Sequence, residues 1–328
     1  MKFFINIAIA SVLVLSFNSC KKENETNWNI EIKNPVDNIE ITDISKEFYD
    51  ANVPLDVFKQ KYPWFQGSVP DEDYGIRRQD AEEIKIYKEA ISKIDQTKLK
   101  KDLAEMFSHI QYYFPDFKIP KTFLYSSALQ GIKDPIFYHS EEHLIFIDIT
   151  AFMGENSVNY KGLEQYFQTS MNPVNIVPKV SGILAEHFVP ANVDRQKFLD
   201  HLVYQGKIVT LQNAFIPNFP DYLKLNYTQK QYQWAVENEV NIWNYFVEND
   251  LLFSDDTRLG ERFIAPAPFS KFYTEIDNES SPQIGIFSGW QICKKFFQEK
   301  PETKMTDFLK LNGQEIFNSA QYKPKFEK

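Results

Sequence analysis

The two cysteines of this 328-residue chain limit how its fold can be stabilised. Cys20 follows a mostly apolar run, residues 3–17, and a small residue stands directly before it. This order is typical of a bacterial signal peptide with a lipobox, which is cut before the cysteine so that its sulfur can carry a lipid. We expect residues 1–19 to be removed and Cys20 to be lipidated, with ordinary secretion and an unmodified cysteine as the alternative. Cys293 then has no disulfide partner, so the core must stabilise the fold.

The segment around Cys20 also argues against a membrane-spanning anchor. A transmembrane helix needs about 20 apolar residues, which is more than this run supplies. Residues 21–27 are polar and contain nothing to bury. We therefore expect residues 20–27 to form a lipidated tether and residues 28–328 to fold as a single globular domain.

Composition restricts the partners and the core of this domain. The net charge is −9, whereas a nucleic-acid or anionic-lipid partner would require a basic face. We expect no nucleic acid, and contact with a membrane only through the N-terminal lipid. Aromatic residues make up 16% of the chain, which predicts a core rich in Phe and Tyr rings.

The first half of the domain contains the predicted strands. Apolar and polar residues alternate across residues 28–41, around a turn-like Asn-Pro-Val-Asp, which predicts a β-hairpin. Helical spacing then extends to about residue 120, and an amphipathic helix from Leu99 to Phe114 is ended by Pro115. Three further strands are predicted at residues 122–125, 135–138 and 143–149, the last two as a hairpin.

The second half is predicted to be almost entirely helical. One helix ends before Pro190, and three more span residues 194–215, 228–250 and 282–299. Ser281 and Pro282 are expected to begin the last of these, in which Gly285 and Gly289 leave a flat stripe for close packing. The chain is therefore predicted to be α+β, with a small central sheet and a mainly helical second half.

The densest group of metal-ligand residue types lies at the tip of the predicted second hairpin. It consists of His139, Glu141, Glu142 and His143. A structural zinc site needs four ligands that converge at about 2.0–2.3 Å, whereas alternate strand residues point to opposite faces. A solvated turn is the favoured interpretation, and we expect no metal and no cofactor.

His187 lies on the apolar face of its predicted helix. A zinc-peptidase helix carries a histidine four residues earlier, to bind the metal, followed by a glutamate that activates water. Those two positions are occupied here by Ile183 and Leu184. Because one ligand cannot hold a catalytic zinc, His187 is predicted to be a buried, hydrogen-bonded core histidine.

Glu239 is predicted to face inward, together with Trp243 and Phe246. A carboxylate there must be paired or protonated. It is either a pocket acid that holds its proton or part of a buried pair with Arg262 or His187, and the pair is favoured. The sequence contains no Gly-rich phosphate loop, nucleophile elbow, Cys-x-x-Cys pair or His-Glu-x-x-His motif, so it does not predict an enzyme.

Four segments of the chain carry a resemblance to a known family. They are Asn175–Pro178, Gln205–Lys207, Asn238–Trp243 and Ile286–Ile292. In this order, and together with the lipobox, they resemble GldB, the gliding-motility lipoprotein family of Bacteroidetes. The resemblance implies a lipid-anchored component of the gliding apparatus, in the outer membrane facing the periplasm, with other envelope proteins as partners. We interpret it as a non-catalytic scaffold or binding module.

From about residue 121 the chain also resembles a zincin-type peptidase domain, in which strands precede a helix ending near His187. Active relatives carry a glutamate as third metal ligand where this chain has Gln205. The resemblance implies a degenerate peptidase fold, and His187, Gln205 and Glu239 form a candidate buried polar site. The alternative function is a zinc peptidase or other hydrolase with an unorthodox site that uses His187, Glu186 or Glu239.

Overall fold

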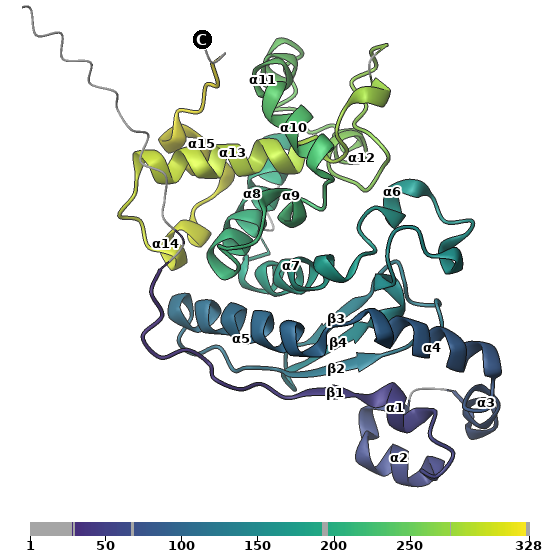
Figure 1. Ribbon diagram of the computed structural model, residues 1–328. Helices are drawn as coiled ribbons and strands as arrows, with labels where there is room; N and C mark the ends of the chain where they lie inside the picture. The colour runs from purple at the N-terminus through teal and green to yellow at the C-terminus, as the bar shows by residue number, and fades with distance from the viewer. Residues whose placement is uncertain (1–27, 29, 67–68, 192–195, 276, 326–328) are drawn as a thin grey trace, which may run out of the picture.

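The computed structural model describes residues 28, 30–66, 69–191, 196–275 and 277–325. The predicted signal peptide, Cys20 and the tether lie outside these residues. The described part is an α+β fold that combines one small mixed sheet with many helices, as predicted (Figure 1). No described helix has the length and apolar character that crossing a membrane requires.

Four strands form the sheet, in the order β1-β2-β4-β3. Their bounds are β1 (Ile41–Asp43), β2 (Lys121–Tyr125), β3 (Ile136–His139) and β4 (Leu144–Asp148). Strands β1, β2 and β4 are parallel, so that Phe123 of β2 lies opposite Phe146 of β4. Strand β3 is antiparallel to β4 and pairs Phe137 with the same Phe146. The three strands predicted after residue 121, and the hairpin formed by the last two, are confirmed.

The first half of the chain supplies five helices. They are α1 (Ile44–Phe48), α2 (Leu55–Lys61), α3 (Asp71–Arg77), α4 (Ala81–Lys93) and α5 (Gln96–Tyr113), with a 3-10 helix at Pro63–Gln66. Helix α5 confirms the predicted amphipathic helix. Asp95 caps it by accepting a hydrogen bond from the Lys98 N–H at 2.9 Å, and Leu103 and Phe107 are fully buried. Pro115 follows its end, because the residue before a proline disfavours the helical conformation.

The predicted β-hairpin at residues 28–41 is wrong. Only its last residue begins a strand, and the preceding segment runs as an extended strap along α5 (Figure 1). The Val36 N–H donates to Ser108 Oγ at 2.8 Å, and the Trp28 ring packs edge-on against Phe297, with centroids 5.1 Å apart. The alternation of apolar and polar residues therefore reflects burial against helices instead of pairing between neighbouring strands.

The two faces of the sheet are buried by different parts of the chain. Leu124 and Ile147 belong to the main core, with Phe107 of α5. Phe123 belongs to a smaller aromatic cluster, in which Trp64 packs on it with ring centroids 4.8 Å apart. Helices α4 and α5 thus lie over one face, and α1 to α3 lie at the other (Figure 1).

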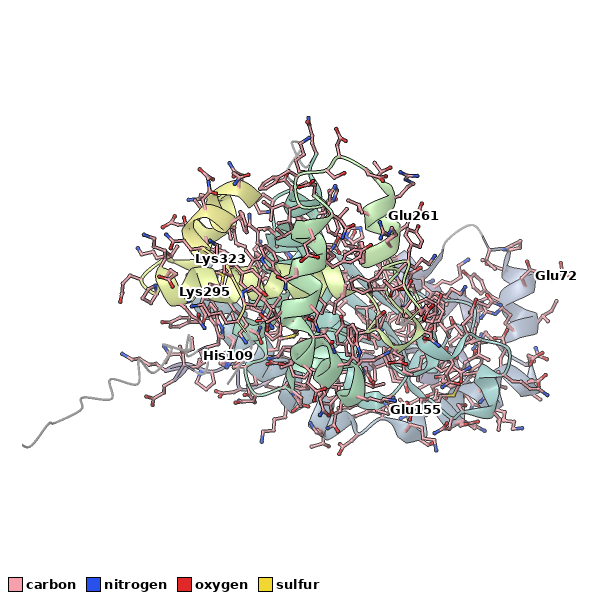
Figure 2. All side chains as sticks on the ribbon, turned by 90° about the horizontal axis from the view of Figure 1, so that it is seen from above. Glu72, His109, Glu155, Glu261, Lys295 and Lys323 are labelled. Carbon is pink, nitrogen blue, oxygen red and sulfur yellow. The ribbon has the colours of Figure 1, made fainter. Side chains whose placement is uncertain are left out.

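The second half of the chain supplies the remaining helices. They are α6 (Gln165–Gln168), α7 (Ile176–Phe188), α8 (Phe198–Phe215), α9 (Asp221–Lys224), α10 (Gln229–Glu237), α11 (Glu239–Glu248), α12 (Arg258–Phe263), α13 (Ile284–Glu299), α14 (Met305–Lys310) and α15 (Gly313–Ala320). Short 3-10 helices lie at Ile149–Phe152, Val158–Tyr160, Pro173–Asn175 and Asp277–Glu279. Apolar side chains fill the space between these elements, whereas charged ones such as Glu72, Glu261 and Lys323 lie at the periphery (Figure 2).

Three predictions of helix bounds differ from the structure, the first being α8, which begins at Phe198 instead of at about residue 194. The helix predicted at residues 228–250 is two helices, α10 and α11, separated at Asn238, whose side-chain amide donates to the Trp234 carbonyl at 2.9 Å. Such a bond competes with the regular helical ladder. Ser281 does not cap α13, because its hydroxyl donates to the Gln231 carbonyl at 2.6 Å. The cap comes from Ser270, whose Oγ accepts from the Ile284 N–H at 3.0 Å.

Candidate functional site

The carboxyl ends of β1, β2 and β4 meet at one edge of the sheet, where Asp43, Ser126 and Asp148 end or follow the three strands. Open sheets with parallel strands usually bind ligands beyond this edge. A ligand-binding site is therefore expected at this edge. Three polar networks lie at or beside this edge: Asp148 belongs to the first, and Asp43 and Ser126 belong to the third.

Asp148 is fully buried, with 0% of its surface exposed. One carboxylate oxygen accepts from the Thr150 N–H at 3.0 Å and the Thr150 hydroxyl at 2.7 Å, and also from the Ser127 N–H at 3.2 Å. The Ser127 hydroxyl donates to the other oxygen. Burial raises the pKa of Asp148, although these hydrogen bonds act in the opposite direction. The carboxyl group joins the loop after β2 to the turn after β4.

The loop that follows β2 has a strained backbone. Ala128 and Leu129 have φ angles of +53° and +73°, in the left-handed region that non-glycine residues rarely adopt. Side-chain oxygens hold this conformation, since the Leu129 N–H donates to Thr150 Oγ1 at 3.4 Å and the Gly131 N–H donates to Ser127 Oγ at 2.9 Å. Backbone strain of this kind persists only where surrounding contacts over-determine it, and such places are common at functional sites.

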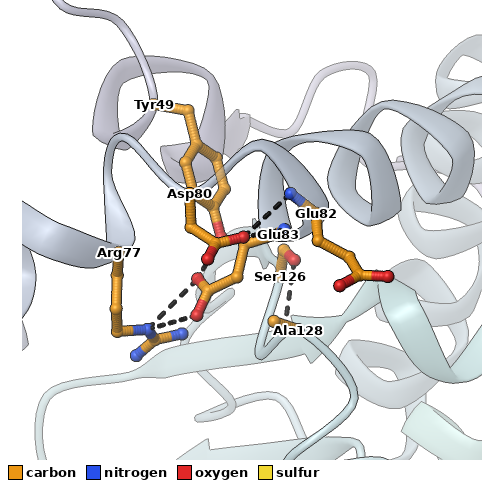
Figure 3. A network of polar contacts seen from close by, with 7 residues as sticks. All are labelled: Tyr49, Arg77, Asp80, Glu82, Glu83, Ser126 and Ala128. Atoms are coloured by element: carbon orange, nitrogen blue, oxygen red, sulfur yellow. Dashed lines mark hydrogen bonds and ion pairs between the residues drawn. The ribbon is translucent and has the colours of Figure 1, made fainter.

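A second network ties three N-terminal helices together beside the same edge (Figure 3). The Tyr49 hydroxyl donates to Glu83 Oε2 at 3.1 Å, and Arg77 Nε donates to Glu83 Oε1 at 2.9 Å. Burial, and secondly the Glu83 charge, raise the pKa of Tyr49, so its hydroxyl remains a donor. Asp80 caps α4 by accepting from the Glu83 N–H at 2.8 Å.

The third network closes the edge between β1 and β2. The Tyr87 hydroxyl donates to Asp43 Oδ2 at 2.6 Å, and the Ser126 N–H donates to Ser45 Oγ at 2.8 Å. Burial raises the pKa of Asp43, and the Tyr87 hydrogen bond opposes that shift. Within each network, the carboxyl and hydroxyl groups thus form hydrogen bonds to neighbouring protein groups. This arrangement braces the edge of the sheet.

His187 is at the surface, so its predicted burial is wrong. It lies near the end of α7, and its ring meets the Tyr138 ring of β3 edge-on, with centroids 5.3 Å apart. The amphipathic pattern misplaced it because Ala185 and Phe188 form the core side of the last turn of α7, and His187 lies on its exposed side. The two positions where a peptidase would carry a ligand and a base are apolar and packed: Ile183 is half-buried, and Leu184 has 0% of its surface exposed.

Glu239 is half-buried at the start of α11, and its predicted pairing with Arg262 or His187 is wrong. The Tyr322 hydroxyl donates to Glu239 Oε1 at 2.6 Å. Burial, and then the Glu239 charge, raise the pKa of Tyr322 well above its ordinary value, so the phenol stays a donor. Arg262 donates to the Tyr245 hydroxyl at 2.9 Å. The contact between Glu239 and Tyr322 could not be predicted from the local sequence, because the two residues are 83 positions apart.

Gln205 is half-buried within α8. The predicted site of His187, Gln205 and Glu239 therefore draws on three helices, α7, α8 and α11. The contacts that orient His187 and Glu239 involve other residues, Tyr138 and Tyr322. The grouping of these three residues stays a prediction.

The acidic and histidine-rich turn between β3 and β4 is partly solvated. Glu141 and Glu142 are exposed, and the Glu142 N–H donates to His139 Nδ1 at 3.3 Å. His143 has a left-handed backbone, with φ of +53°. Within the ranges that the structure describes, no three His, Cys, Asp or Glu side chains are grouped so that they could hold a metal ion.

A groove of about 580 Å³ lies between the strap and α5, and it contains a residue that sequence reasoning missed. His109 is 3% exposed, and its Nδ1 has no hydrogen-bond partner among the described residues. Burial lowers the pKa of His109 and favours the neutral imidazole, which can exchange a hydrogen bond with a ligand. The available signal was a histidine on the buried side of the helix from Leu99 to Phe114.

Comparison with known protein families identifies the family of this chain. The family described as "Gliding motility protein GldB" matches residues 25–324, which is most of the chain. No curated protein and no solved structure shows significant similarity to it.

Proposed function

Because the chain belongs to the GldB family of gliding motility proteins, we propose that it is a lipid-anchored, non-catalytic component of the gliding apparatus, acting as a scaffold or binding module in the cell envelope. We place it in the outer membrane, facing the periplasm, with other envelope proteins of that apparatus as partners. Cys20 carries the lipid in this proposal.

The observation that supports a non-catalytic role is the packing of α7. Leu184 is fully buried in the main core and Ile183 packs against that core. A metal-binding imidazole and a catalytic carboxylate at these positions would need water and polar neighbours. Here the neighbouring side chains form a closed apolar core. The degenerate zincin-like domain from about residue 121 remains part of this proposal.

We also propose that residues 28–328 function as one domain. The main core contains Ile147 from the sheet, Phe107 from α5 and Trp290 from α13 in one continuous cluster. Burial of apolar surface shared by both halves of the chain favours their folding as one cooperative unit. A scaffold built in this way would present its partners with a rigid surface.

The test replaces the side chains that an unorthodox hydrolase would use. His187→Ala, Glu186→Gln and Glu239→Gln are introduced singly into gliding cells that lack the original copy. Each variant should restore gliding speed to that of cells carrying the unchanged protein, with equal protein levels in the membrane fraction. Immobile cells with normal protein levels would contradict the proposal, as would stoichiometric zinc and peptide hydrolysis in purified protein. In that case the hydrolase alternative would stand.

A further inference from the structure

A small cavity beyond the carboxyl end of β4 is lined by two lysines. It measures about 30 Å³ and lies next to Ala151, just after the strand. Lys179 of α7 and Lys133 of the loop before β3 are its charged lining residues, and Leu163, Phe167 and Met171 supply apolar walls. None of the described residues that line this cavity carries a carboxylate.

Lys179 is half-buried, and its contacts differ from those of the buried Lys207 and Lys224. Lys207 Nζ donates to the carbonyl oxygens of Leu309 and Leu311, at 2.8 and 2.6 Å. Lys224 Nζ donates to Asn213 at 2.6 Å and pairs with Asp221 at 3.1 Å. Lys179 has no hydrogen bond or ion pair with any described residue. Lys179 is half-buried, and a partly desolvated cation without a protein partner is stabilised by a nearby anion.

The environment of Lys179 shows how unfavourable its charge is in the absence of a partner. Burial lowers the pKa of Lys179 to about 8. Lys133, which is exposed, also lines the cavity, and its Nζ lies 5.2 Å from the centre of the Phe167 ring. An anion in the cavity would give the Lys179 ammonium group a partner of opposite charge.

The size of the cavity restricts the kind of anion. One water molecule needs roughly 10–15 Å³ of such space, so the cavity holds about two. Two water positions match the two oxygens of a carboxylate, whereas a phosphate group with four oxygens is larger.

We propose that this cavity binds the carboxylate group of a ligand, through an ion pair with Lys179 and a second charge contact with Lys133. The carboxylate belongs either to a free small organic acid or to the C-terminus of a polypeptide. This site is separate from the braced networks at Asp43 and Asp148. The proposal of a carboxylate-binding cavity does not depend on the proposed scaffold function.

The test measures the reactivity of single lysines in the full mature chain, held in detergent. Cyanate carbamylates neutral amines, and mass spectrometry gives the rate at each lysine. We expect 100 mM sodium acetate to slow carbamylation of Lys179 at least threefold relative to 100 mM sodium chloride, with no change at Lys224. N-acetyl-glycyl-leucine should protect Lys179, and its C-terminal amide should not. Protection by this peptide at tenfold lower concentration than acetate identifies a polypeptide C-terminus, and equal protection identifies a free acid.

Variants give a second readout that does not depend on labelling. N-acetyl-glycyl-leucine should raise the melting temperature of the unchanged protein and of Lys161→Met, which removes an exposed lysine nearby in the chain. It should not raise the melting temperature of Lys179→Met. Absence of protection by both carboxylates, equal protection by chloride or the amide, or an equal melting shift in Lys179→Met would overturn the proposal.

Discussion

A Cβ atom placed on Gly206 of α8 would lie 2.2 Å from the backbone oxygen of Gly289 on α13. On the other side of this crossing, a Cβ on Gly289 would lie 1.8 Å from the backbone oxygen of Leu202. The two helices therefore meet backbone to backbone, which only residues without a side chain allow. The stripe predicted at Gly285 and Gly289 is confirmed, and its counterpart is Gly206.

Gly289→Ala should destabilise the protein, because neither backbone can move away without opening the core around it. We expect the free energy of unfolding to fall by about 1–3 kcal/mol or more, with Gly289→Leu worse. Urea unfolding measures the change. Gly260→Ala in α12 is the control, since no atom lies within 4 Å of its added Cβ. Equal stability of Gly289→Ala and Gly260→Ala would contradict the close approach.

Restoring the peptidase pattern on paper should not restore a metal site. The triple variant Ile183→His, Leu184→Glu and Gln205→Glu places a carboxylate where Leu184 is fully buried. Each buried polar group without partners costs roughly 1–3 kcal/mol, so we expect misfolding or weak zinc binding. Isothermal titration with zinc and a thermal melt decide the matter. Nanomolar binding by a folded triple variant would show that the metal geometry persists, whereas Ile183→His alone should fold normally.

Lys179 should make the stability of the protein depend on pH in a defined window. Its pKa is about 8 in the folded protein, against an ordinary value of 10.5, so the unfolded chain holds the proton more tightly. The unfavourable burial of the charge is fully present below pH 8 and fades as pH rises to 10.5. Lys179→Met should therefore gain stability over the unchanged protein at pH 7, and less at pH 10. Urea unfolding at both values tests this, with the exposed Lys161→Met as control.

Cys20→Ala should abolish lipidation, because no other residue near the predicted cleavage site offers a sulfur. The protein should then leave the membrane fraction of fractionated cells. Labelled palmitate measures the modification directly. Label in the Cys20→Ala protein would show that the lipobox assignment is wrong, and Cys293→Ala, which removes a buried thiol, should keep the label.

Part of the candidate site could be anticipated from the chain, and part could not. The strands that end at Tyr125 and Asp148 were predicted, so the edge where they meet was within reach. The hydrogen bonds at this edge were not predicted. The Ser126 N–H donates to Ser45 Oγ, and the Tyr87 hydroxyl of α4 donates to Asp43 at the end of β1. Hydrogen bonds between distant segments leave no periodic trace in a sequence. His187 was misplaced because the core contacts the other side of the last turn of α7, at Ala185 and Phe188, and a single helix does not reveal which side its neighbours cover.

The sequence by itself determined the elements whose burial repeats with the period of their own backbone. The segment from Leu99 forms a helix that ends at Tyr113, and residues 143–149 contain a strand, because each pattern is local and has its own stop signal. Tertiary structure alone decided what those elements meet: β1 pairs with β2 instead of closing a hairpin, Ser270 caps α13, and Tyr322 binds Glu239. These partners are set by packing, because the stable arrangement is the one that buries the most apolar surface of the whole chain. The sequence of a single segment does not determine that surface.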